Sequence, residues 1–252
     1  MNQKVLFTRT LEKKFSRFGI WTPGTLQLGD IVDADTFERI GNISDKRFNI
    51  QFESEVRLED HGQTREWSTD GTKTIAGGVN SEVAQSEISM QFGNKNGIYF
   101  STKGCVITEI KNQDVLGKSI IKLFEKGKGK WKESYYVVTE LECADKVIVI
   151  VTNDKNAEVK FHVDADIPAQ AKLVEANFKI GTCSCVSHSI ASDKPNTSVL
   201  FAAKKIHTKY WGLGATEFRG ELDGRQTSNA SAFEFSDLVP EDFDKYEENN
   251  PE

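Results

Sequence analysis

Two segments of the chain repeat their apolar residues at the spacing of an amphipathic helix. The first spans residues 3–18, where apolar residues recur in steps of three and four and basic residues collect on another face. Its apolar positions are Phe7, Leu11, Phe15 and Phe18, and its basic positions are Arg9, Lys13 and Arg17. The second segment spans residues 115–124, and Gly127 fits its end. We therefore expect a basic amphipathic helix at the start of the chain and another helix near its middle.

Two further segments alternate apolar and polar residues, which is the pattern of a strand with two different faces. Residues 48–58 alternate first, and residues 84–92 alternate again after a polar, glycine-containing stretch from 60 to 78. The apolar positions are Phe48, Ile50, Phe52, Val56 and Leu58 in the first run and Ala84, Ile88, Met90 and Phe92 in the second. This arrangement predicts a long hairpin with a flexible tip.

A second strand-rich region follows the middle helix. Residues 135–141 and 146–152 have no polar face, which predicts strands buried on both sides. Residues 157–167 then alternate strictly, with Val159, Phe161 and Val163 among the apolar positions. A tilted transmembrane strand needs roughly nine to eleven residues, although an ordinary solvent-facing strand has the same pattern. The polar face could cross a membrane only beside water, since a charge facing lipid costs about 2–4 kcal/mol.

Charge is distributed unevenly along the 252 residues. The net charge of -6 argues against a general nucleic-acid binder, which normally carries a basic excess. The first eighteen residues hold five basic side chains against Glu12 alone, whereas residues 233–252 hold eight acids against Lys245 alone. The two ends can attract each other, and a solvated tail that only aids solubility is the simpler interpretation.

A concentrated cationic loop follows the middle helix. Lysines alternate with glycines and a tryptophan, at Lys126, Lys128, Lys130, Trp131 and Lys132. An exposed solubilising turn and an anion-binding loop both fit this pattern. The same choice holds for the first helix, which fits a packed surface helix as well as a membrane-surface helix.

No stretch of the sequence has the eighteen or so consecutive apolar residues of a transmembrane helix, and the amino terminus is too polar for a secretory signal. We therefore expect a cytoplasmic protein. Its four cysteines, Cys105, Cys143, Cys183 and Cys185, are then expected to be reduced thiols.

Motifs for catalysis are missing from the sequence. It has no phosphate-binding glycine loop, zinc-protease helix or nucleophile elbow. Cys183, Cys185 and His188 form the one tempting cluster, but two residues usually separate paired zinc cysteines and a second ligand pair is not evident. A structural role for the cluster is favoured over a zinc site. We expect no enzyme activity, no cofactor and no metal.

The order of these features resembles the pore-forming amino-terminal domain of gasdermins. The basic first helix is followed by Trp21-Thr-Pro and a strand over residues 25–32. A strand pair around the Ala-Gly-Gly tip at 75–79, a helix with a basic exit, and Tyr136-Val-Val-Thr-Glu140 come next. Residues 197–206 are similar to the last strand of that domain.

The resemblance implies an α+β fold in which a twisted, mainly antiparallel sheet is flanked by helices. It places a pore-forming domain at residues 1–206 and a carboxy-terminal extension with an acidic tail at 207–252. It further implies that the protein binds acidic phospholipids, oligomerises and inserts two hairpins per protomer as a transmembrane β-barrel. The protein would be cytoplasmic when inactive and at the plasma membrane when active.

The resemblance also assigns site residues. The lipid contacts would be Lys4, Arg9, Lys13, Lys14 and Arg17, together with Lys126, Lys128, Lys130 and Lys132. Trp21 would be an interfacial membrane anchor. The inserting strands would lie within residues 48–92 and 147–173 and include Phe48, Ile50, Phe52, Ile88, Met90, Phe92, Val159, Phe161 and Val163.

Typical animal gasdermins carry a large inhibitory domain, which we do not expect in residues 207–252. Restraint would then come from a short tail removed by an activating protease, from a missing partner, or from low intrinsic affinity. Short fungal relatives cause heterokaryon incompatibility, a form of allorecognition in which two variants meet, so a hetero-oligomer is one expected partner. That type is favoured slightly over the bacterial one. The competing hypotheses are a non-lytic immunity or regulatory module that binds another protein and a zinc enzyme built on Cys183, Cys185 and His188.

Overall fold

The computed structural model describes residues 2–80, 85–126, 131–164, 173–175, 178–208 and 233–243. The helices are α1 (Gln3–Phe15), α2 (Gln113–Glu125) and the short 3-10 helices η1 (Leu173–Glu175) and η2 (Pro240–Phe243). The strands are β1 (Phe18–Gly19), β2 (Asp30–Asp33), β3 (Arg39–Asn42), β4 (Ser54–Ser68), β5 (Thr72–Asn80), β6 (Gln85–Phe92), β7 (Ile98–Ile110), β8 (Tyr135–Thr152), β9 (Glu158–Asp164), β10 (Phe178–Ser184), β11 (Val186–Ser192), β12 (Thr197–Thr208) and β13 (Phe233–Asp237). The predicted α+β class is confirmed, since helices accompany two sheets and every strand pairing among the described residues is antiparallel.

Both predicted helices are present. The Asn2 side chain caps α1 by accepting a hydrogen bond from the Lys4 backbone N–H at 2.9 Å. The helix ends at Phe15 and is capped by Ser16, which adopts a left-handed conformation with φ 54°. The predicted end at residue 18 is three residues too late, because Phe18 already pairs with Phe201 as part of β1.

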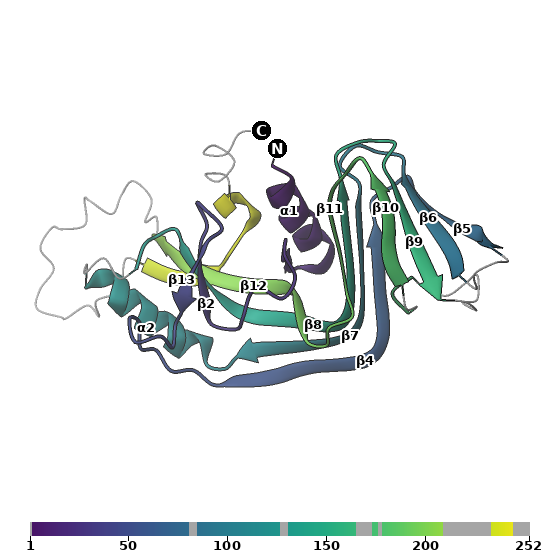
Figure 1. The fold of residues 1–252 in the computed structure, drawn as a ribbon. Helices are drawn as coiled ribbons and strands as arrows, with labels where there is room; N and C mark the ends of the chain where they lie inside the picture. Colours follow the sequence, from purple (N-terminus) through teal and green to yellow (C-terminus); the bar gives the residue numbers. More distant parts are fainter. Residues whose placement is uncertain are drawn as a thin grey trace, which may run out of the picture.

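The strand β8 is the centre of the larger sheet. Residues 135–137 of β8 pair with β2, and residues 136–144 pair with β12. From residue 140 onward β7 replaces β2 on one side, and from residue 147 onward β11 replaces β12 on the other. The two buried runs that the sequence predicts as separate strands are therefore one strand of 18 residues. In Figure 1, β4, β7 and β8 run along the base of the molecule and then bend upward beside β11.

A smaller sheet of four strands, in the order β10-β9-β6-β5, lies beyond this bend. It folds back beside the rising parts of β7, β8 and β11 (Figure 1). One hydrophobic cluster fills the space between these layers. Its members include Met90, Phe92, Val159 and Phe161 from the smaller sheet and Tyr99, Ile148 and Ile150 from the larger one.

The predicted start and tip of the first hairpin are wrong. Phe48 lies in a turn, where its amide donates to the Asp45 carbonyl and its ring contacts Trp131, and β4 begins only at Ser54. The stretch predicted as polar and flexible, residues 60–78, contains most of β4 and β5. Its polar residues occupy paired strands because long-range register, rather than local apolarity, decides their conformation.

The extension beyond residue 206 returns to the fold. β13 pairs with the end of β12, and Phe243 of η2 is fully buried. The Phe243 ring stacks on Phe37 and meets Phe18 and Tyr136 edge-on. The division of the chain at residue 206 stays a prediction, and the described residues 233–243 pack against the preceding segment.

Candidate functional site

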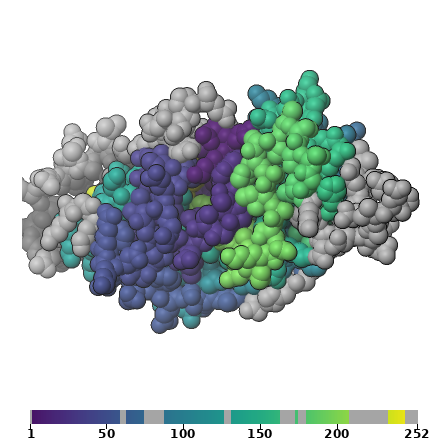
Figure 2. All heavy atoms as spheres, in the orientation of Figure 1, coloured from purple at the N-terminus to yellow at the C-terminus, as the bar shows by residue number. Residues whose placement is uncertain are grey.

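The amino-terminal helix presents only part of its basic face to solvent. Lys13 and Lys14, in its last turn, are exposed. Lys4 is half-buried with its amine 4.5 Å from the centre of the Phe37 ring, and burial lowers the pKa of this amine. Arg9 is also half-buried. On the face shown in Figure 2, the purple amino-terminal segment reaches the surface between the blue-violet residues that follow it and the light-green residues that lie shortly before position 200 in the sequence.

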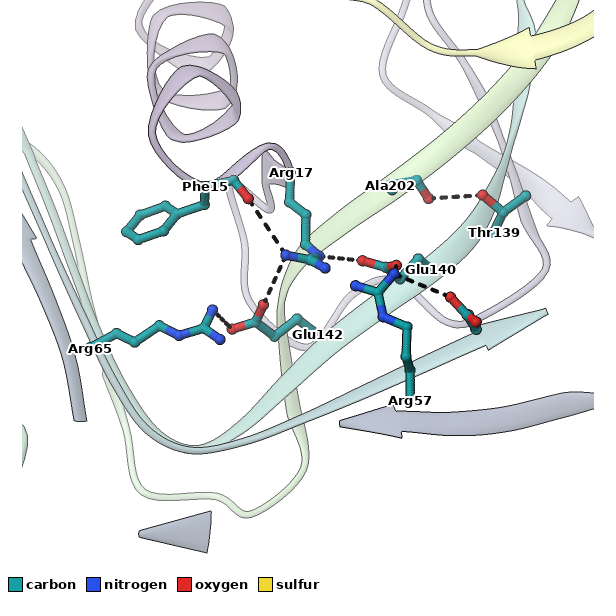
Figure 3. Close-up of polar contacts among 9 residues, drawn as sticks. Phe15, Arg17, Arg57, Arg65, Thr139, Glu140, Glu142 and Ala202 are labelled. Atoms are coloured by element: carbon teal, nitrogen blue, oxygen red, sulfur yellow. Dashed lines mark hydrogen bonds and ion pairs between the residues drawn. The ribbon is translucent and has the colours of Figure 1, made fainter. Parts of the chain in front are cut away.

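Arg17 is held inside an ion-pair cluster. Its guanidinium bonds the Glu140 carboxylate and lies 3.9 Å from that of Glu142, and its side chain is 14% exposed. Arg57 reaches Glu140 at 2.8 Å, and Arg65 reaches Glu142 at 2.6 Å. Figure 3 shows these arginines converging on the two glutamates of β8. The cluster ties the end of α1 to β4 and β8, so a lipid contact by Arg17 would require these pairs to break.

Trp21 contacts protein on both sides in this structure. Its indole stacks on the His188 imidazole with ring centres 4.1 Å apart and meets Phe7 edge-on. His188 Nε2 also lies 2.7 Å from the Trp21 carbonyl oxygen. Burial lowers the pKa of His188, and the hydrogen bond to the carbonyl opposes that change. The contact joins the segment after α1 to β11, and the anchor role of Trp21 stays a prediction.

The structure describes only part of the cationic loop at residues 126–132, which is the second cluster of predicted lipid contacts. Lys126 and Lys132 are exposed, and the Lys132 amine lies 5.6 Å from the Tyr135 ring. Lys128 and Lys130 lie outside the described residues. Trp131 is buried between Phe48 and Tyr135. Among the residues predicted to contact lipid, the described lysines that are exposed are therefore Lys13, Lys14, Lys126 and Lys132.

The residues predicted to insert fall into two groups. Phe48, Ile50 and Phe52 precede β4 and pack with the core beneath α2. Ile88, Met90, Phe92, Val159 and Phe161 share the buried face of the smaller sheet, as their alternation predicts. Val163 pairs with Ser86 and Phe178, and its side chain lies outside the described part of the chain.

Alternation in the sequence did not reveal that the two hairpins pair with each other. Ile88 of β6 stands opposite Phe161 of β9, and Met90 stands opposite Val159. The returning strands β10 and β11 carry weak periodicity, with Ile180 and Val186 packed against the same cluster. The apolar residues of β6, β9 and β10 thus meet those of β11 in one cluster between the two sheets.

The Cys183, Cys185 and His188 cluster does not assemble as a metal site. Both cysteines are exposed at the bend between β10 and β11, while His188 is engaged by Trp21. Among the described residues, no group of three or more histidine, cysteine, aspartate or glutamate side chains is placed to hold a metal ion. Burial raises the pKa of the Cys105 and Cys143 thiols to about 11. Within the same residues, no helix has the length and apolar character needed to cross a membrane.

Comparison with known proteins gives a likeness in structure and none in sequence. No model of a protein family matches the chain, and no curated protein matches it. A cryo-EM structure of the gasdermin A3 membrane pore matches with 9% sequence identity, over 83% of this chain and 91% of that chain, at a TM-score of 0.31. Likeness at this level establishes neither a family nor a function.

Proposed function

We propose that this chain is a gasdermin-like, pore-forming cell-death protein. It rests in the cytoplasm, docks on acidic phospholipids of the plasma membrane, oligomerises and inserts two β-hairpins per protomer into a transmembrane β-barrel. It acts without catalysis and does not bind nucleic acid. The expectation rests first on the order of sequence features, and the following structural observations support it.

The observation that carries the proposal is the pairing of the two hairpins. β6 of the first hairpin pairs with β9 of the second over seven residue pairs, which joins four strands in one sheet. On the two central strands, β6 and β9, one face is apolar and buried, while Gln91 and His162 on the other face are exposed. Strands with one apolar and one polar face are those that can separate lipid from water in a barrel wall.

The outer edges of this sheet are open within the described residues. There, β5 pairs only with β6, and β10 pairs only with β9. Open edges bind further strands, and a ring of copies would close them. Closure matters because backbone groups that face lipid must find partners within the protein.

Four of the predicted lipid contacts are exposed lysines, Lys13, Lys14, Lys126 and Lys132, which would supply the docking surface. Each basic residue near an anionic leaflet contributes about 1 kcal/mol, so the four exposed lysines together give useful affinity. We propose that Lys4, Arg9 and Arg17 join them after their present contacts are released. Lys128 and Lys130 would extend the second cluster.

A partner or a protease would release the contacts that now hold these basic residues. The described end of the chain contacts the basic part of the fold, since Lys205 lies 2.8 Å from Asp242 and Phe243 is buried close to α1. A protease that removed this segment would uncover that surface. A hetero-oligomer with a variant of the same family would be the alternative trigger, as in allorecognition.

Dye release from lipid vesicles tests the proposed function. Purified protein, alone or after proteolysis, should empty vesicles that contain acidic phospholipid and leave purely zwitterionic vesicles intact. Release from neither kind, together with a monomer that forms a stable complex with another protein, would favour the non-lytic binding module instead.

A further inference from the structure

Four strands of the larger sheet follow the same order as the four strands of the smaller sheet. β4 pairs with β7, β7 with β8, and β8 with β11, and we call these four strands the proximal layer. The smaller sheet, called here the distal sheet, has the order β5-β6-β9-β10. Along the chain, β4 leads to β5, β6 to β7, β8 to β9 and β10 to β11. Each proximal strand therefore has its own continuation in the distal sheet, at the same place in the order.

All four strands are interrupted at matching positions. The interruptions are residues 69–71, 93–97, 153–157 and Cys185, and together we call them the fold line. On either side of the line, Ser68 stands opposite Tyr99 and Thr72 stands opposite Phe92. In the next pairs of strands, Ile98 of β7 stands opposite Val151 of β8, and Gln91 of β6 stands opposite Glu158 of β9. The distal sheet is thus a continuation of the proximal layer that has been turned back.

At the fold line, backbone hydrogen bonds also join each strand to its neighbour. The Gly93 amide donates to the Gly71 carbonyl at 3.0 Å, and the Thr69 amide donates to the Ile98 carbonyl at 2.9 Å. The Thr152 amide donates to the Gly97 carbonyl at 2.8 Å. These bonds join neighbouring strands that would turn together if the distal sheet rotated. A rotation about the line therefore leaves the pairing within each sheet intact.

The backbone at the fold line suits such a rotation. Gly71 adopts φ +82°, a region open to glycine, and a Cβ on Gly93 would lie 3.0 Å from the Gly71 carbonyl oxygen. Cys185, the single residue between β10 and β11, also has a positive φ of 54°. A few terminal residues of strands are the usual places where a hinge absorbs changes in φ and ψ.

Apolar side chains hold the two layers together. Val159 and Phe161 of the distal sheet are fully buried in the cluster that also contains Ile148 and Ile150 of the proximal layer. Opening the fold line would expose this cluster without breaking the ladders of either sheet. The cost in water is apolar exposure, which contact with lipid would remove.

We propose that the distal sheet is a preformed unit that turns outward about the fold line as one body, so that both hairpins reach the membrane together with their mutual pairing intact. This proposal rests on the proposed pore-forming function and specifies the movement that leads to it. Separate refolding of each hairpin is the contrary route, and it requires β6 and β9 to part.

A disulfide between the hairpins distinguishes the two routes. Gln91 and Glu158 are direct partners on β6 and β9, and so are Ser89 and Lys160. Direct antiparallel partners have Cα atoms about 4.5–5.5 Å apart, which lies within the range that a disulfide spans. We would make Gln91→Cys with Glu158→Cys, and separately Ser89→Cys with Lys160→Cys. Both would be placed in a background in which the exposed Cys183 and Cys185 are changed to serine.

Rotation as one body predicts equal dye release from acidic vesicles by the oxidised and reduced forms of each pair. Release by the reduced form alone, with activity restored by a reductant, would overturn the rotation and leave the pore-forming function standing. If the protein without an engineered disulfide fails to release dye, the proposed function is overturned, and the rotation with it.

A second pair of variants tests whether apolar contacts between the two layers keep the fold line closed. Ile150→Ala removes an apolar contact between the layers, whereas Val151→Ala removes a buried side chain from the opposite side of the same strand. Ile150→Ala should speed dye release about tenfold or more over Val151→Ala, if it weakens the closed state by at least 1.4 kcal/mol. Equal acceleration by the two would contradict the proposal.

Discussion

Glu142 is a fully buried carboxylate, and two arginines from different parts of the chain surround it. Arg65 belongs to β4, and Arg17 follows α1. A buried charge without its partner costs more than the pair contributes, so loss of either member leaves an unfavourable charge behind. Arg17 therefore has a structural role in this conformation, whatever it does at a membrane.

Glu142→Gln should lower the free energy of unfolding by about 3–5 kcal/mol, because it leaves Arg65 without its compensating carboxylate and removes one of the two carboxylates beside Arg17. Urea unfolding followed by circular dichroism measures the change. Glu55→Gln is the control, since Glu55 is half-exposed and pairs with Lys111 at 3.5 Å. A loss in the control as large as in Glu142→Gln would show that burial of the cluster is unimportant.

Charge reversal at Lys13 and Lys14 tests lipid docking without disturbing this cluster. The double change to glutamate should weaken binding to acidic vesicles at least thirtyfold, because it removes two contributions of about 1 kcal/mol each and adds repulsion. Vesicle co-sedimentation gives the affinity. The matched control is Lys155→Glu with Lys194→Glu, two exposed lysines outside both cationic clusters. Arg17 is left out, since its reversal would damage the fold.

The contact between Trp21 and His188 should make stability depend on pH. Burial lowers the pKa of His188 in the folded protein below its ordinary value of 6.5. The neutral imidazole thus stabilises the fold above pH 6.5, and this contribution is lost as pH falls through the folded pKa. The loss of unfolding free energy between pH 7.5 and pH 5 should be larger for the unchanged protein than for His188→Gln. Identical losses would refute the assignment.

At the scale of elements, periodicity predicts the helices and the faces of β6 and β9 well. Leu116 and Ile120 of α2 are buried as their spacing requires, and Met90 and Phe161 face the core as their alternation requires. Apolar periodicity works there because one side of each element contacts the core. It fails at residues 60–70, where polar β4 residues pair with β7.

Pairing between distant segments could not be read from local pattern. The β6–β9 ladder joins residues about seventy positions apart, and β13 adds to β12 across 24 residues that the structure does not describe. The candidate lipid residues show the same limit. Lys13 and Arg17 share one helical face in the sequence, but tertiary contacts leave Lys13 exposed and bury Arg17.

The packing of η2 gives a prediction for the carboxy-terminal element. Phe243→Ala should lower the free energy of unfolding by about 3–5 kcal/mol, because it opens a cavity among Phe18, Phe37 and Tyr136. Val239→Ala, at a side chain that is 42% exposed, should change it by less than about 1 kcal/mol. Thermal or urea unfolding measures both. A negligible effect of Phe243→Ala would mean that this segment does not pack as described.

At the scale of the whole molecule, the fold places the apolar faces of β6 and β9 between two layers, and it places the exposed Lys13, Lys14 and Lys126 at the ends of the helices. The same face of β6 and β9 is the core in water and would be the lipid-facing wall in a membrane. The two faces of one strand must therefore meet opposite demands, with lipid on one side and water on the other.

A fluorescent label on either face of β6 tests that demand most directly. Ile88→Cys places the label on the apolar face, and Gln91→Cys places it on the exposed face. Cys183 and Cys185 are changed to serine, while Cys105 and Cys143, with pKa values raised to about 11, stay protonated and react slowly at pH 7. On acidic vesicles, acyl-chain quenchers should quench the label at position 88 and aqueous iodide the label at position 91. Quenching of position 88 by iodide alone, on vesicles that bind the protein, would contradict the account.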